Sequence, residues 1–292
     1  MRNRPAPGAL AENTGLAFSG AHVHPGLVMG PGRAERMLAA HNPHGKPNAD
    51  VLRPYRDADD LRGMDRSGVT VSTPLKAPSI TGRGACPQDA FRGTRSSGRV
   101  EGSASHLGET GSRWIVDFPA DMTPEEAALY EQPWQLWVEA GGVLHTRADP
   151  MRIAVSRVEW FLAAPSRIAP RGFARIETPT LPGAGLVVVA SDDDFVAAVL
   201  ESAVFDAWVH ANGGRLRVWH VASFPFPWAP RAELGALTRE QLEVRDKVIR
   251  AGADDLDGAV AAAYGWHDIA DDADLAGRLR SMHKALRLQS GL

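Results

Sequence analysis

A run of alternating proline and aromatic residues is the feature that most limits what this chain can fold into. It reads Ser223-Phe-Pro-Phe-Pro-Trp228 and is called here the Phe-Pro segment. Because proline lacks an N–H and fixes φ, neither a helix nor a central strand can continue through it. We expect a rigid extended segment, anchored in the body of the protein by Phe224, Phe226 and Trp228.

The residues after the Phe-Pro segment predict a helical tail. Leu256-Asp-Gly-Ala-Val-Ala-Ala-Ala-Tyr-Gly-Trp266 is an Ala-rich helix ended by a glycine, so Tyr264 and Trp266 can dock onto the body. Thr238 and Gln241 have the spacing of a helix-capping box. A stripe of apolar residues at steps of 4, 3 and 4 is expected to pack against the body or a partner: Leu275, Leu279, Met282 and Leu286.

Residues 67–112 differ in kind from the rest of the chain. Gly, Ser, Thr and Pro dominate them, and their large apolar residues follow neither the helical nor the strand period. Such a segment cannot bury enough apolar surface to offset the entropy of ordering it. We therefore predict a low-complexity, disordered insertion over 67–112 that separates two parts of one domain, 1–66 and 113–230, with the helical tail at 231–292.

The ordered parts alternate between helix and strand signals, which predicts a mixed α/β (α+β) fold. Residues 15–30 favour two short strands joined by a turn, and Pro31–Ala40 favours a helix. Thr123-Pro-Glu-Glu126 has a helix N-cap, a first-turn proline and a capping-box glutamate. Pro133 is expected to break or kink that helix. After the buried strands at 113–118 and 186–190, Asp192 is expected to cap one long helix.

Composition excludes several classes of protein. The net charge of −3 argues against nucleic-acid binding by bulk electrostatics, although it leaves room for a local basic face. A single cysteine, Cys86, excludes an internal disulfide and a cysteine zinc cluster, which fits a reducing cytoplasm. The chain has neither an apolar run of the ~18 residues of a membrane span nor an apolar signal core. We therefore expect a cytoplasmic protein with no membrane partner.

Methyl-transfer motifs are missing from the chain. An adenine methyltransferase needs a Gly-rich cofactor loop and an Asp/Asn-Pro-Pro-Tyr/Phe turn that holds the flipped base. Asn42-Pro-His and Asp149-Pro-Met lack the second proline and the aromatic residue, and Phe18-Ser-Gly lacks the acidic partner and following helix of a cofactor loop. We assign no catalytic and no cofactor-binding residue.

Other candidate sites have simpler interpretations. His22 and His24, with His41 and His44 nearby, allow the hypothesis of a metal-dependent hydrolase, but zinc needs three or four ligands of fixed geometry. Polar edge and loop histidines are the preferred interpretation, so no metal ligand is assigned. The acidic run at 192–194 fits the start of a helix, and Ser223 lacks a nucleophile elbow.

Taken in order, the motifs resemble the C-terminal portion of the MmeI-type single-chain adenine DNA methyltransferases of bacterial restriction-modification systems. The segments that carry the resemblance are Gly15-Leu-Ala-Phe-Ser-Gly20, Asn48-Ala-Asp-Val-Leu-Arg-Pro-Tyr55 with Asp60-Leu61, Trp114-Ile-Val-Asp-Phe118, Glu126-Ala-Ala-Leu-Tyr130, Glu159-Trp-Phe161, Val187 to Asp194, and Phe224-Pro-Phe-Pro227. Two features depart from the family pattern: residues 67–112 have no counterpart, and the stretch between Arg171 and Pro182 is shorter.

The resemblance implies a target-recognition domain without its catalytic half. Its partners would be duplex DNA and a separate methyltransferase chain that binds S-adenosylmethionine, whereas this chain would bind no cofactor and be inactive alone. The expected DNA contacts are Arg53, Tyr55, Arg56, Arg147, Arg152, Arg157, Arg215 and Arg217. Two alternatives stay open: a non-functional remnant or protein-interaction module, and the metal hydrolase based on His22 and His24.

Overall fold

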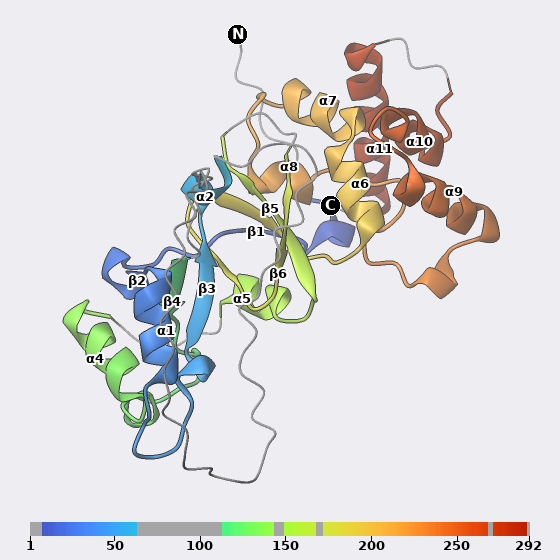
Figure 1. Cartoon of the computed structure of the whole chain (residues 1–292). Helices are drawn as coiled ribbons and strands as arrows, with labels where there is room; N and C mark the ends of the chain where they lie inside the picture. The colour runs from blue at the N-terminus through green and yellow to red at the C-terminus, as the bar shows by residue number, and fades with distance from the viewer. Residues whose placement is uncertain (1–7, 63–112, 143–148, 168–171, 268–270, 291–292) are drawn as a thin grey trace, which may run out of the picture. The chain divides into compact units, whose positions relative to one another are not determined.

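The protein has a mixed α/β fold with two four-stranded sheets (Figure 1). The computed structural model describes residues 8–62, 113–142, 149–167, 172–267 and 271–290. All of these belong to one compact unit, Met1–Val71 with Gly111–Leu292. The second unit, Ser72–Thr110, and the whole insertion predicted at 67–112 lie outside the described residues.

The first sheet is antiparallel throughout. Its order is β1 (Ala17–Ser19), β8 (Leu186–Val189), β5 (Trp160–Pro165) and β6 (Ala174–Glu177). Every residue of β5 and β8 is buried. Leu186 and Val188 face the first hydrophobic core, which also includes the second sheet. Val187 and Val189 face the second hydrophobic core, which also includes α6 and α7. The unbroken apolar run of β8 follows from this placement, because a strand covered on both faces has no solvent side.

The second sheet is smaller and includes one parallel pair. Its order is β2 (Val28–Met29), β4 (Arg113–Val116), β3 (Leu52–Arg56) and β7 (Leu181–Pro182), and β3 and β7 run parallel. Its strands pack into the first core with residues of α1, α4 and α5. The helices of the described residues are α1 (Pro31–Ala39), α2 (Ala58–Arg62), α3 (Pro124–Ala127), α4 (Glu131–Glu139), α5 (Pro150–Val155), α6 (Asp194–Glu201), α7 (Ala203–Ala211), α8 (Val218–Ala222), α9 (Arg239–Arg250), α10 (Leu256–Ala263) and α11 (Asp272–Gln289).

The Phe-Pro segment joins the helical tail to the second core. Phe224 and Phe226 are buried and meet edge to face at 4.9 Å, while Trp228 stacks on Phe195 of α6 at 4.5 Å. The Tyr264 hydroxyl donates a hydrogen bond to the Pro225 carbonyl (2.9 Å), and burial raises the pKa of Tyr264. The expected docking of the tail onto this segment is therefore confirmed for Tyr264.

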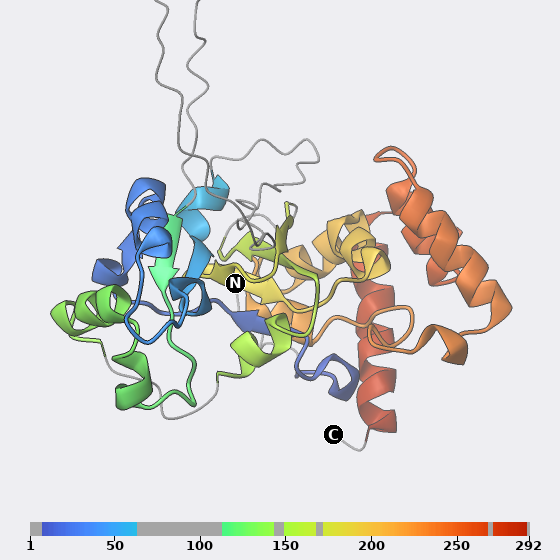
Figure 2. The ribbon, with the colours of Figure 1, turned by 60° about the horizontal axis from the view of Figure 1, so that its bottom comes forward.

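The tail helices pack against α6 and α7. Figure 2 shows them, in orange to red, gathered beside these two helices, and contacts join α9 to α6 and α11 to α7. Of the predicted apolar stripe, Leu275 and Leu279 are buried, whereas Met282 and Leu286 are partly exposed. The capping box of Thr238 and Gln241 is present. No helix among the described residues is long and apolar enough to cross a membrane.

The two strands expected in residues 15–30 do not form a hairpin. β1 belongs to the first sheet and β2 to the second. Between the two strands, the chain passes beside Gly183, which forms a bridge with Ala21. The Ala21 N–H donates to the Pro182 carbonyl (2.8 Å). A side chain at Gly20 would collide with the Gly183 carbonyl, so the close approach requires glycine there.

Two helix predictions need correction. The capping box of Thr123 and Glu126 is confirmed, but the helix stops at Ala127 and a new one starts at Glu131, with Pro133 inside its first turn. There the missing N–H of proline costs nothing, because the first-turn N–H groups have no partner within the helix. The single helix expected after Asp192 is two helices, α6 and α7, and its N-cap is Asp193.

Candidate nucleic-acid interface

Three segments that are far apart in the sequence meet at the end of β3. The Gly183 N–H donates to the Arg56 carbonyl (2.6 Å), and the Ser166 N–H donates to the Gly185 carbonyl (2.7 Å). The Arg167 N–H donates to the Leu216 carbonyl (2.8 Å). These bonds place the ends of β3 and β5 and the residues before α8 side by side.

Four arginines lie along this line of hydrogen bonds, and we call them the arginine edge: Arg56, Arg167, Arg215 and Arg217. Leu216 is fully buried, and its two neighbours, Arg215 and Arg217, are exposed. Arg167 is also exposed and has a positive φ of 65°, which is uncommon for a residue other than glycine. Within the described ranges, none of the four forms an ion pair.

A second group of charged residues joins β3 to α5. The Arg53 Nε lies 3.2 Å from one carboxylate oxygen of Asp117, and Arg152 of α5 binds the other oxygen. The Arg152 Nε is 3.6 Å from Asp149, whose side chain caps α5 by accepting from the Met151 N–H (2.9 Å). Two of the expected DNA contacts, Arg53 and Arg152, therefore share one carboxylate and carry a net charge of +1 with it.

The remaining expected contacts have different surroundings. Arg157 is exposed just after α5, and Arg147 lies outside the described residues. Tyr55 needs correction, because it is a core residue with only 4% of its surface exposed. Its ring packs against Gly183, and Arg113 lies 5.2 Å from the ring centre. Tyr55 therefore positions the end of β3 and does not reach the surface itself.

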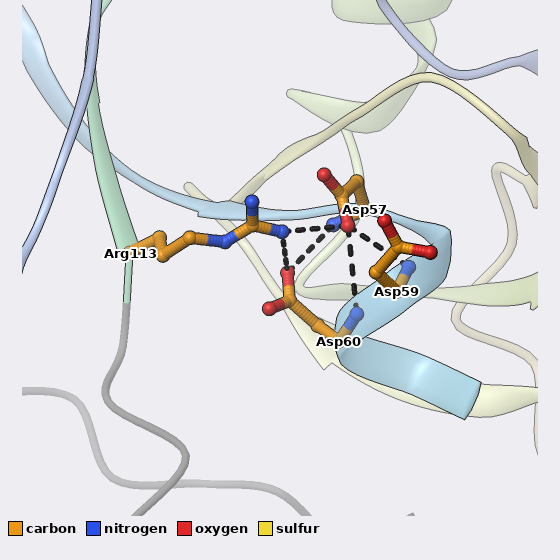
Figure 3. A network of polar contacts seen from close by, with 4 residues as sticks. All are labelled: Asp57, Asp59, Asp60 and Arg113. Atoms are coloured by element: carbon orange, nitrogen blue, oxygen red, sulfur yellow. Dashed lines mark hydrogen bonds and ion pairs between the residues drawn. The ribbon is translucent and has the colours of Figure 1, made fainter. Parts of the chain in front are cut away.

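Arg113 is the centre of an ion-pair network beside the arginine edge (Figure 3). One of its terminal nitrogens lies 2.6 Å from both Asp57 and Asp60, which stand at the start of α2. Burial raises the pKa of Asp57, but hydrogen bonds from Arg113 and from the backbone N–H groups of Asp59 and Asp60 outweigh it, so the pKa is lowered. The same carboxylates raise the pKa of Arg113. The network therefore fixes the positions of α2 and of the first residue of β4.

The fold is similar to that of a known DNA-bound enzyme. No protein-family model and no curated protein matches the sequence. Among solved structures, the type IIL restriction-modification enzyme MmeI, in complex with DNA, matches with a TM-score of 0.50 and 12% identity. The match covers 98% of this chain and 37% of the MmeI chain. The chain thus shares its fold with part of MmeI and spans about a third of the length of that enzyme.

Among the described residues, His22 and His24 have local structural surroundings. In the part of the chain that the structure describes, no group of three or more His, Cys, Asp or Glu residues could hold a metal ion. The His24 Nδ1 accepts a hydrogen bond from the Gly26 N–H (3.2 Å), a local cap. His22 and His24 line a pocket of about 200 Å³ with Asp117 and Arg152. The carboxylate of this pocket, Asp117, is already bound by Arg53 and Arg152.

The acidic run and Ser223 also have structural roles. Asp193 caps α6 and pairs with Arg245 of α9 at 2.6 Å, and Asp194 pairs with Arg175. Asp192 accepts from the Glu159 N–H (3.1 Å). The Ser223 hydroxyl donates to the Trp219 carbonyl (2.6 Å), so it is part of the end of α8.

The sequence analysis did not select two residues of this region, Arg167 and Asp117. Arg167 was not selected because its proximity to Leu216 depends on a tertiary hydrogen bond. Asp117 was seen only as part of the segment Trp114–Phe118. A buried carboxylate inside an apolar strand is a useful signal, because such a group is almost always paired with a cation.

Proposed function

We propose that this chain is the DNA target-recognition portion of an adenine-specific DNA methyltransferase or restriction-modification enzyme, with catalysis supplied by another part or chain. The observation that carries the proposal is the fold shared with MmeI, a restriction-modification enzyme solved with DNA, over 98% of this chain. The order of the sequence motifs supports the same assignment independently of the fold.

The arginine edge supports duplex DNA as the ligand. Arginines that contact phosphates fix the position of a protein on the duplex, while contacts to base edges select the sequence. Four arginines with no ion pair among the described residues suit the first task, although the whole chain has a net charge of −3. We assign Arg56, Arg167, Arg215 and Arg217 to the phosphate backbone.

Binding to duplex DNA as a function of salt tests this assignment. Each phosphate contact contributes about −0.9 to the slope of log K against log salt, so three to five contacts give a slope of roughly −2.7 to −4.5. The double variant Arg215→Gln, Arg217→Gln should make the slope shallower by about 1.8. A matched control replaces Arg239 and Arg250 of α9, which are exposed but lie elsewhere in the fold. It should leave the slope unchanged.

The methylation chemistry is assigned to the missing catalytic part. S-adenosylmethionine would bind there, because this chain has neither the Gly-rich cofactor loop nor the turn for the flipped base. A folded chain that shows no binding to any duplex at low salt would contradict the proposed function and favour the alternative of a remnant or protein-interaction module.

One observation favours the protein-interaction alternative as a second candidate. A cavity of about 760 Å³ lies between the last two helices and is walled by Tyr264 and Trp266, whose rings stack at 4.4 Å, and by Met282. Co-purification with a methyltransferase chain, lost in Met282→Glu but retained in Arg215→Gln, would support this role. If the Met282→Glu and Arg215→Gln variants retained equal amounts of the methyltransferase chain, the protein-interaction role of this cavity would be contradicted.

A further inference from the structure

Arg53 presents the end of its guanidinium group in a fixed orientation. Its Nε lies 3.2 Å from the Asp117 carboxylate and forms an ion pair with it, so the Nε side of the group faces that carboxylate. Among the described residues, no hydrogen bond uses its two terminal nitrogens. The side chain is 34% exposed. A guanidinium held at Nε has its terminal fork free to bind two acceptors at once.

Asp117 is itself held in place, which makes the orientation of Arg53 specific. Its side chain is 10% exposed, and Arg152 binds its second oxygen. Arg152 also approaches Asp149, the N-cap of α5, and the backbone N–H of Asp117 donates to the Val51 carbonyl (2.8 Å). A rigid chain of charges thus runs from α5 through Asp117 to β3. Among the residues that the structure describes, Arg152 meets two carboxylates and Arg53 meets one.

We propose that Arg53 reads a guanine in the DNA target through two hydrogen bonds to the O6 and N7 atoms of the base. This inference rests on the proposed function and names the residue that would select sequence. An arginine fork fits that pair of acceptors, and the contact discriminates only if the fork is held still. A phosphate contact needs positive charge but no such support, and the neighbouring Asp117 carboxylate weakens attraction for a phosphate.

The arginine edge provides the internal comparison. Its four members have no carboxylate partner among the described residues, whereas Arg53 has one at 3.2 Å. Arg56 lies three residues further along β3 than Arg53, a distance of about 10 Å along a strand. Because side chains alternate between the two faces of a strand, Arg53 and Arg56 point to opposite faces of β3, and the two contacts are therefore tested separately.

The experiment first selects duplexes from a randomised pool with the wild-type chain. Each guanine of a selected duplex is then replaced in turn by 7-deazaguanine, which lacks the N7 acceptor. At one position we expect binding to weaken by about 2- to 13-fold, because the analogue keeps O6 and removes roughly half of a bidentate contact. Arg53→Lys keeps the charge but not the fork, so it should lose this sensitivity and keep the salt slope. Arg239→Lys, in α9, should keep both, and circular dichroism checks that each variant is folded.

Each other outcome overturns a defined statement. If Arg53→Lys stays sensitive to 7-deazaguanine, or if no selected guanine matters, Arg53 does not read a guanine. If Arg53→Gln makes the salt slope shallower by about 0.9 and keeps the guanine preference, Arg53 contacts a phosphate. If the wild-type chain binds no duplex at all, the proposed function fails together with this inference.

Discussion

At the scale of single residues, Arg113 shows how one side chain can hold two elements together. It bonds to Asp57 and Asp60, whose side chains are 17% and 12% exposed. Arg113→Ala leaves both carboxylates without this cation. We expect a loss of about 1–3 kcal/mol in the free energy of unfolding, less than for a fully buried pair because Arg113 is partly exposed. Urea unfolding at pH 7 measures it, with Arg157→Ala as the exposed control.

The pH dependence of that loss follows from Asp57. Its pKa is lowered in the folded protein from the model-peptide value of 3.8, so its stabilising contribution is present above that value. This contribution is lost as the pH falls through the pKa that Asp57 has in the folded protein. The difference between wild type and Arg113→Ala should therefore shrink below pH ~4. A difference that is constant down to pH 3 would show that the ion pair does not cause it.

His220 also makes the protein less stable as the pH falls, but at a higher pH than Asp57 does. It is buried in α8, its Nδ1 accepts from the Arg217 N–H (3.0 Å), and burial lowers its pKa to about 4. Below pH ~6.5 the unfolded chain takes up a proton that the folded chain does not, so stability falls as the pH falls towards 4. We expect a loss of about 2 kcal/mol between pH 8 and pH 5. In His220→Asn that part of the pH dependence should be absent, and an unchanged profile would contradict the assignment.

At the scale of elements, the β3–β4 pair predicts that residues 63–112 are dispensable for folding. Tyr55 pairs with Arg113 in the ladder, and the Arg113 network ties α2 to the start of β4, so both ends of the segment are held close together. Replacing 63–112 by about six Gly/Ser residues should keep the fold and add about 2 kcal/mol, because a shorter loop loses less entropy on closure.

Thermal unfolding followed by circular dichroism measures this change. Arg113→Ala in the shortened chain serves as the control, because it breaks the network that holds the two ends. It should remove most of the gain. Loss of cooperative unfolding in the shortened chain alone would show that the segment contributes to the core.

Elements whose signals are local could be predicted from the sequence. The capping boxes at Thr123 and Thr238 depend on neighbouring residues, and both are present. The break between α6 and α7 could not be foreseen, since the Ala203 N–H donates to Asp257 of α10 (2.6 Å), a partner 54 positions away. The arginine edge escaped prediction for the same reason: tertiary hydrogen bonds bring Arg167 to Arg215 and Arg217.

At the scale of the whole molecule, the proposed division of labour predicts an inactive chain. Incubated with labelled S-adenosylmethionine and mixed-sequence DNA, the purified chain should transfer no more label than a heat-treated sample, because the methyl-transfer motifs are missing. A catalytic adenine methyltransferase domain serves as the positive control. Transfer above background would place a methyl-transfer site in this chain and contradict the proposal.

The pairing of the first described residues with the last third of the chain sets the order of events during synthesis. β1 adds to β8, Leu10 donates to the Ala222 carbonyl (2.9 Å), and the Asn13 amide donates to three carbonyls between Val221 and Phe224. On the ribosome, the N-terminal residues must therefore wait until the Phe-Pro segment has emerged. Contacts this distant in sequence slow folding, so most of the nascent chain is exposed to chaperones and proteases before its second core closes.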